Sequence, residues 1–80
     1  MKTLELNDHE LSVTDFSNFE LTVQKKYGKC TASYETWTTP QGQSYIRVTH
    51  PVIEFDDSQV QEEELEELIK PFGFHRVPPA

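Results

Sequence analysis

The sequence has a single cysteine and no long apolar run, and each of these shortages argues against one class of protein. Cys30 cannot form an internal disulfide, whereas domains this small outside the cell usually carry several cysteines. No segment approaches the roughly 18 apolar residues of a membrane span, and the first residues are polar rather than leader-like. We therefore expect a cytoplasmic protein with no membrane partner.

Basic residues are also scarce. Seven Lys and Arg face fourteen Asp and Glu, which gives a formal net charge of −7. A polyanion such as DNA or RNA would be repelled by the molecule as a whole, so a basic macromolecular partner is expected and direct nucleic-acid binding is not. With 80 residues, we expect one small domain over residues 1–77 and a flexible tail over 78–80.

Patterns that carry catalysis or metal binding are missing. Three glycines are too few and too scattered for a phosphate-binding loop. His9, His50 and His75 lie far from one another and from Cys30, without the close spacing of structural zinc ligands. Cys30 with a histidine base is one candidate nucleophile, but an unpaired cysteine is more often a small core residue. We predict no enzyme activity, no cofactor and no metal.

The first 55 residues alternate between apolar and polar side chains, which favours β-strands. We predict one hairpin from Leu4 and Leu6 with Leu11 and Val13. A second hairpin is expected to turn at residues 26–29, joining a strand over residues 19–23 to one over 30–38. Pro40 and Gly42 suit a type I turn into a further strand over residues 43–49. Pairing should lapse at Pro51 and resume only at an edge, over residues 52–55.

One amphipathic helix is predicted over residues 58–70. Ser58 and Gln61 have capping-box spacing, and Pro71 opposes continuation. Residues 74–77 could add a last edge strand. The fold class predicted is α+β: an antiparallel β-meander of four to six strands with one C-terminal amphipathic helix packed on it. The expected core comprises Phe16, Phe19, Leu21, Val23, Ile46, Val48, Ile53, Phe55, Leu65, Leu68, Ile69 and Phe72.

The acids are unevenly distributed. Residues 54–67 hold eight of the fourteen acids and no Lys or Arg. Like charges at i, i+4, such as Glu62 with Glu66, each cost a few tenths of a kcal/mol in helix stability. Two interpretations remain open: the acids keep the protein soluble, or they dock on a basic surface.

The leading functional hypothesis is a non-catalytic binding protein whose acidic helix docks on a basic, nucleic-acid-binding surface of a larger protein or ribonucleoprotein. Carboxylates along a helix can stand in for successive phosphates. In its size, acidity and lack of catalytic motifs the chain resembles small phage-encoded inhibitors, of the anti-restriction or anti-CRISPR kind. The candidate partner-binding residues are Glu54, Asp56, Asp57, Glu62, Glu63, Glu66, Glu67 and Trp37.

Two alternatives use other residues. An assembly or regulatory subunit could bind through a sheet edge and Trp37. A single-strand nucleic-acid binder could use Lys25, Lys26 and Lys29 beside aromatic side chains on neighbouring strands. Those aromatic residues are Tyr34, Trp37 and Tyr45.

Overall fold

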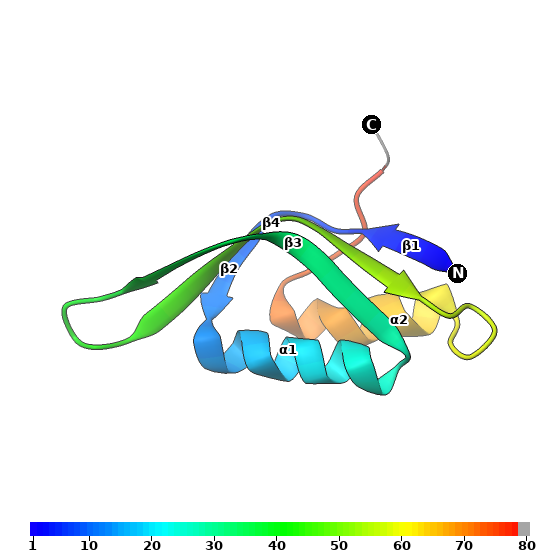
Figure 1. Ribbon diagram of the computed structural model, residues 1–80, viewed down its shortest axis with the longest axis horizontal. Helices are drawn as coiled ribbons and strands as arrows, with labels where there is room; N and C mark the ends of the chain where they lie inside the picture. The colour runs from blue at the N-terminus through cyan, green and yellow to red at the C-terminus, as the bar shows by residue number, and fades with distance from the viewer. Residues whose placement is uncertain (79–80) are drawn as a thin grey trace.

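The computed structural model describes residues 1–78, which form an α+β fold of one four-stranded antiparallel sheet and two helices (Figure 1). Both helices lie on the same side of the sheet. The α+β class with an antiparallel sheet is therefore confirmed, and four strands lie within the predicted range of four to six. The sheet is not the predicted meander, because the other three strands all pair with the last strand, and a second helix over residues 13–25 was not predicted. The elements are β1 (Lys2–Glu5), β2 (His9–Ser12), α1 (Val13–Lys25), β3 (Gly28–Thr38), β4 (Ser44–Phe55), α2 (Glu62–Ile69) and the 3-10 helix η1 (Lys70–Phe72).

The central strand is β4, which pairs with β3 along one side and with two short strands along the other. On that other side β1 pairs with residues 52–55 and β2 with residues 45–48. The predicted hairpin between the first two strands is thus wrong, because β1 and β2 both pair with β4. The polar linker holds this arrangement: Asp8 accepts a hydrogen bond from the backbone N–H of His50 at 2.8 Å, and Asn7 accepts one from that of His75 at 2.7 Å.

A bulge bends β4 at His50 and Pro51. These two residues oppose the single residue Ala32 of β3, where the pairing register shifts, and His50 takes a positive φ of 51°. Bulges are one of the few places in a sheet where proline is tolerated, because a ladder donor is already lost there. The predicted interruption at Pro51 therefore appears as a register shift. The strand continues beyond it in the centre of the sheet, and the edge position expected for residues 52–55 is wrong.

The predicted third strand, over residues 19–23, is part of helix α1, and the hairpin built on it is also wrong. Ser12 caps α1 by accepting a hydrogen bond from the backbone N–H of Asp15 at 3.1 Å. Phe16, Phe19 and Val23 follow the three- and four-residue spacing of one helix face and are buried, whereas Leu21 is 53% exposed. Phe19, Leu21 and Val23 alternate with polar residues, and that short alternation imitated a strand.

Helix α2 begins four residues later than predicted. Ser58 does not cap it: both the hydroxyl and the backbone N–H of Ser58 donate to Asp56, at 2.6 and 3.0 Å, in a turn before the helix. Gln61 occupies the N-cap position without a side-chain bond. The helix ends at Ile69, close to the predicted end, and η1 follows with Gly73 at a φ of 91°.

The core lies between the sheet and the two helices. Nine predicted core residues are buried, Leu68 and Phe72 are half-buried, and the prediction for Leu21 is wrong. Phe74 is buried against Phe19, with ring centroids 4.5 Å apart. The predicted last strand is reduced to one bridge between Leu6 and Arg76. Of the tail predicted over residues 78–80, residues 79 and 80 lie outside the described residues. The buried residues that the sequence did not predict are Leu4, Leu6, Leu11, Pro51, Val60 and Phe74.

Candidate binding surfaces

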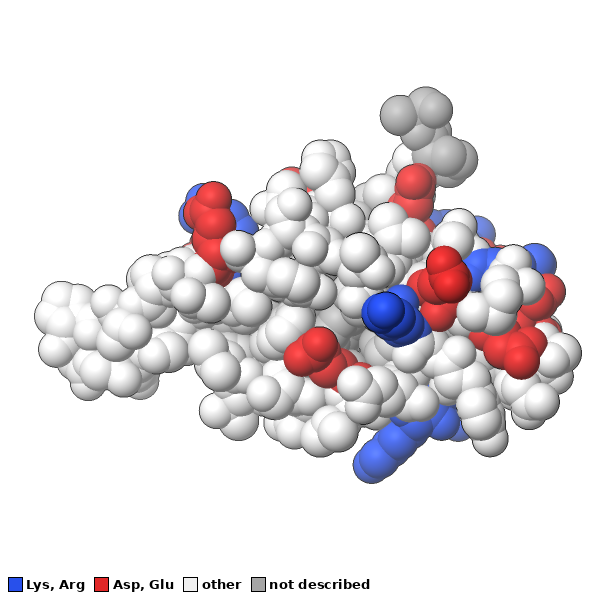
Figure 2. All heavy atoms as spheres, in the orientation of Figure 1, with Lys and Arg blue, Asp and Glu red and all other residues white. Residues whose placement is uncertain are grey.

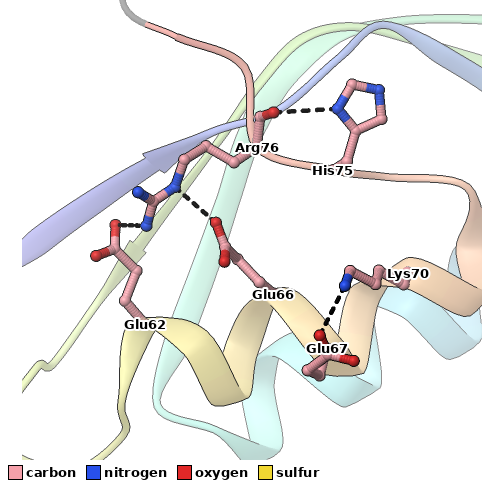
Figure 3. Close-up of polar contacts among 6 residues, drawn as sticks. All are labelled: Glu62, Glu66, Glu67, Lys70, His75 and Arg76. Atoms are coloured by element: carbon pink, nitrogen blue, oxygen red, sulfur yellow. Dashed lines mark hydrogen bonds and ion pairs between the residues drawn. The ribbon is translucent and has the colours of Figure 1, made fainter.

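The acids of α2 are tied to basic side chains from other parts of the chain (Figure 3). Arg76 reaches across from the C-terminal segment to Glu62 and, through its Nε, to Glu66 at 2.6 Å. This pairing raises the pKa of Arg76, chiefly through the hydrogen bond to Glu62. Two carboxylates that repel each other along the helix therefore share one cation.

Two further pairs reduce the charge of the same helix. Lys26, at the end of α1, lies 2.8 Å from Glu64, and Lys70 lies 2.6 Å from Glu67. The helix carries five glutamates, and Lys26, Lys70 and Arg76 offset three of them, so about two net negative charges remain. In Figure 2 the red and blue side chains are accordingly interspersed over this end of the molecule.

The remaining acids of residues 54–67 differ in their surroundings. Glu54 is exposed on β4, opposite Lys29 of β3 in the pairing register. Asp56 accepts two hydrogen bonds from Ser58, which lower its pKa. Asp57 lies 3.6 Å from the amino group of Met1. Glu63 forms no ion pair with any residue between 1 and 78. Glu54 and Glu63 thus keep the least compensated carboxylates.

Trp37 does not join this acidic group. It lies near the far end of β3, at the opposite end of the molecule from α2 (Figure 1). Its ring stacks on Tyr45 of β4 at 5.8 Å, and the guanidinium of Arg47 lies 5.7 Å from the ring centroid. Arg47 also reaches Glu10 of β2 at 3.2 Å. The predicted partner-binding residues therefore form two separate surfaces.

The hairpin beyond Trp37 is an uncharged arm. Residues 36–46 contain no Asp, Glu, Lys or Arg, and the arm extends past the end of α1 with no helix beneath it (Figure 1). In Figure 2 this end of the molecule is white throughout. Residues 36–38 and 40–44 are exposed, whereas Tyr45 is half-buried and Ile46 is buried, so both faces of the arm meet solvent only towards its tip.

Strand β3 also presents an open edge, which the sequence analysis did not place. At the two ends of the β3–β4 ladder, Thr39 N–H donates to the carbonyl of Gln43 at 2.7 Å and Asp56 N–H donates to that of Tyr27 at 3.4 Å. Odd-numbered residues therefore direct their backbone groups towards β4, and even-numbered residues direct theirs outwards. The outward-facing residues are Gly28, Cys30, Ala32, Tyr34, Thr36 and Thr38.

The lysines and aromatic residues proposed for nucleic acid are not on one platform. Tyr34 faces the helix side and packs on Phe16, with ring centroids 5.3 Å apart. Trp37, three residues further on, points to the opposite face. Lys26 is paired with Glu64, and the predicted hairpin tip at residues 26–29 is instead the junction between α1 and β3.

Cys30 is half-buried beside Tyr34 on the helix side of β3. Burial is the main cause that raises the pKa of the Cys30 thiol. It is also the main cause that raises the pKa of Tyr34 to about 12. A thiol with a raised pKa is protonated at neutral pH and is a poor nucleophile. His9 packs against Phe74, with ring centroids 5.6 Å apart. Within residues 1–78 no three His, Cys, Asp or Glu side chains converge as metal ligands.

Comparison with known proteins does not assign the chain to a family. No family model matches the chain, and no curated protein or solved structure is significantly similar to it. None of the helices in residues 1–78 has the length and apolar character needed to cross a bilayer. The candidate surfaces are therefore defined by their geometry: the open edge of β3 with Trp37, and the acidic surface around α2.

Proposed function

We propose that this chain is a non-catalytic protein-binding module that engages its partner through the open edge of β3 and the aromatic side chains beside it. The observation that carries the proposal is the edge itself: eleven residues of extended backbone, with outward N–H and C=O groups and only Lys29 and Glu35 as charges. Natural edge strands are usually short, twisted away or heavily charged, which prevents association. A long, lightly charged edge is suited to strand addition by a partner.

The composition beside the edge supports binding to protein. Trp37, Tyr45 and Arg47 form one contact cluster, and Trp, Tyr and Arg are the residues that most often dominate binding energy at protein interfaces. Trp37 is 37% exposed and Tyr34 is 42% exposed, so each retains apolar area to bury. The uncharged arm beyond them imposes little desolvation cost on a partner.

The test is capture of the partner by immobilised protein, followed by affinity measurement with that partner. Trp37→Ala should weaken binding tenfold or more, which corresponds to about 1.4 kcal/mol. Leu21→Ala is the matched control, because it removes an apolar side chain of comparable exposure from the far side of α1. If Trp37→Ala binds as tightly as the Leu21→Ala control, the edge of β3 is not the binding surface.

A second candidate is docking of the acidic surface on a basic, nucleic-acid-binding site, as in the phage-inhibitor hypothesis. The observation that favours it is that Glu54 and Glu63 have no ion pair among residues 1–78, so their charge is available to a partner. Against it, three cations already offset the other α2 glutamates, which lowers the affinity that charge alone can supply.

Docking through the acidic surface is tested with a separate double variant. Glu54→Gln with Glu63→Gln removes the two free carboxylates and leaves the Arg76 pairs intact. Binding led by this surface should fall tenfold or more and should weaken steeply between low and physiological salt. Asp15→Asn with Glu20→Gln on α1 removes equal charge elsewhere and controls for net charge. Equal affinities for the two double variants would exclude the acidic surface.

A further inference from the structure

We infer that the edge of β3 is occupied by a second copy of this chain, paired antiparallel about a two-fold axis at Ala32. This inference rests on the proposed function, since it names the partner of the same edge. The pairing would extend each four-stranded sheet into one eight-stranded sheet, with β3 of the two copies at its centre.

The backbone geometry permits this register. A two-fold axis at Ala32 places residues opposite each other whose numbers sum to 64. Ala32 then meets Ala32 of the second copy, and Cys30 meets its Tyr34. These residues are even-numbered and direct their N–H and C=O groups outwards, so they become the hydrogen-bonded pairs of the new ladder.

The charges select this register among those that the backbone allows. Lys29 and Glu35 are the only charged residues of β3. The sum of 64 places Lys29 of each copy opposite Glu35 of the other, which makes two ion pairs related by symmetry. Both residues are odd-numbered, so they occupy non-hydrogen-bonded positions, where side chains of opposite strands lie closest, with Cα atoms about 4.5 Å apart.

The same register brings exposed aromatic residues together at both ends of the interface. The numbers of Trp37 and Tyr27 also sum to 64, so Trp37 lies near Tyr27 of the second copy, which is the residue just before β3 and has a positive φ of 61°. Tyr27 is 62% exposed, the most exposed aromatic side chain among residues 1–78, and it has no aromatic neighbour within its own chain. Aromatic pairs across strands stabilise sheets beyond their buried area. The exposed Tyr27 of one copy and the exposed Trp37 of the other would therefore lie at the same end of the interface.

The net charge of the two copies does not prevent this contact. The main contacts of helix α2, which carries five glutamates, are with α1 and η1. Each acidic helix is therefore packed mainly on α1 and not on the strand that forms the new ladder. Charges within a Debye length, about 8 Å at physiological salt, govern the interface. Besides the two Lys29–Glu35 pairs, they include Glu54 and Arg47, which lie opposite Lys29 and Glu35 on β4 and balance each other. They also include Glu20 of α1, which is close enough to Cys30 and Tyr34 to contribute to their raised pKa values.

The test is sedimentation equilibrium of the full chain, with charge reversals that report on the register. The wild-type chain should dimerise. Glu35→Lys and Lys29→Glu should each raise the dimer dissociation constant tenfold or more, because each places two like-charge pairs across the two-fold axis. The double variant Lys29→Glu with Glu35→Lys should dimerise more tightly than either single variant. It should stay weaker than the wild-type chain, because the reversed charges face Glu54 and Arg47 of their own β4 with like sign. Circular dichroism and melting curves of every variant confirm that the chain is folded.

Three results would overturn the inference: a wild-type chain that stays monomeric to millimolar concentration, a dimer insensitive to the single reversals, or a double variant no better than the single ones. A monomer whose binding to a different protein still depends on Trp37 would refute the second copy as occupant and leave the proposed function intact. A monomer in which Trp37→Ala also changes no binding would refute both.

Discussion

Gly73 and Gly42 both adopt a left-handed backbone conformation, but only Gly73 faces another side chain. The φ angles are 91° and 87°. A Cβ at Gly73 would overlap the ring of His9, which packs on Phe74, whereas a Cβ at Gly42 would meet nothing within 4 Å. Gly73 therefore has a packing role in addition to its conformational role at the end of η1.

This pair of glycines gives a matched prediction. Gly42→Ala should reduce the free energy of unfolding by about 1 kcal/mol, the cost of a left-handed non-glycine residue in an open turn. Gly73→Ala should cost about 2–4 kcal/mol, because His9 must also move off Phe74. Urea denaturation of both variants measures the difference. Equal losses would show that the His9 contact contributes nothing.

At the scale of elements, α2 depends on residues outside itself. It has no side-chain N-cap, and its glutamates repel one another at i, i+4. Arg76 joins Glu62 and Glu66, and Leu65 and Ile69 are buried in the core. The helix is thus held by its apolar face and by a cation from the C-terminal segment.

Arg76→Gln should therefore lower the melting temperature at low ionic strength. The loss should shrink towards 1 M salt, where the Debye length is about 3 Å and the glutamates no longer repel strongly. Lys70→Gln is the control, since Lys70 pairs only with Glu67 on the exposed side of the helix. Its effect should be smaller at every salt concentration. A loss for Arg76→Gln that does not change with salt would mean that packing, not charge, explains the role of Arg76.

Across the whole molecule, the core is closed by residues that are distant in sequence. Phe74, from the C-terminal segment, packs against Phe19 of α1 and His9 of β2. Leu4 and Leu6 complete the core from the other end of the chain. Segments near both ends of the described residues, 1–78, therefore contribute to the core, which the sequence pattern had assigned to residues 16–72.

Phe74→Ala should cost about 3–5 kcal/mol of unfolding free energy, because it empties a fully buried aromatic site. Leu21→Ala, at a position that the sequence analysis placed in the core, should change stability by no more than about 0.5 kcal/mol, since the side chain is 53% exposed. Thermal and urea denaturation compare the two. A large loss for Leu21→Ala would contradict the orientation of α1.

The sequence by itself determined the features that depend on local pattern: the α+β class, the turn at Pro40 and Gly42, and a helix ending near residue 70. It could not distinguish α1 from a strand, because Phe19, Leu21 and Val23 alternate as in a strand, while Phe19 and Val23 alone also have the four-residue spacing of a helix face.

Only the tertiary structure decided which strands pair and which charges meet. A four-residue strand carries no information about its partner, so β1 and β2 could pair with each other or with β4. Arg76 and Lys26 reach the α2 glutamates only after folding, which is why the acidic surface looked stronger in sequence than it is in space. Likewise, the edge of β3 is open because the segment before it folds as α1, whereas the predicted strand there would have paired with β3. Chain connectivity, rather than local propensity, therefore sets which strand lies outermost in the sheet.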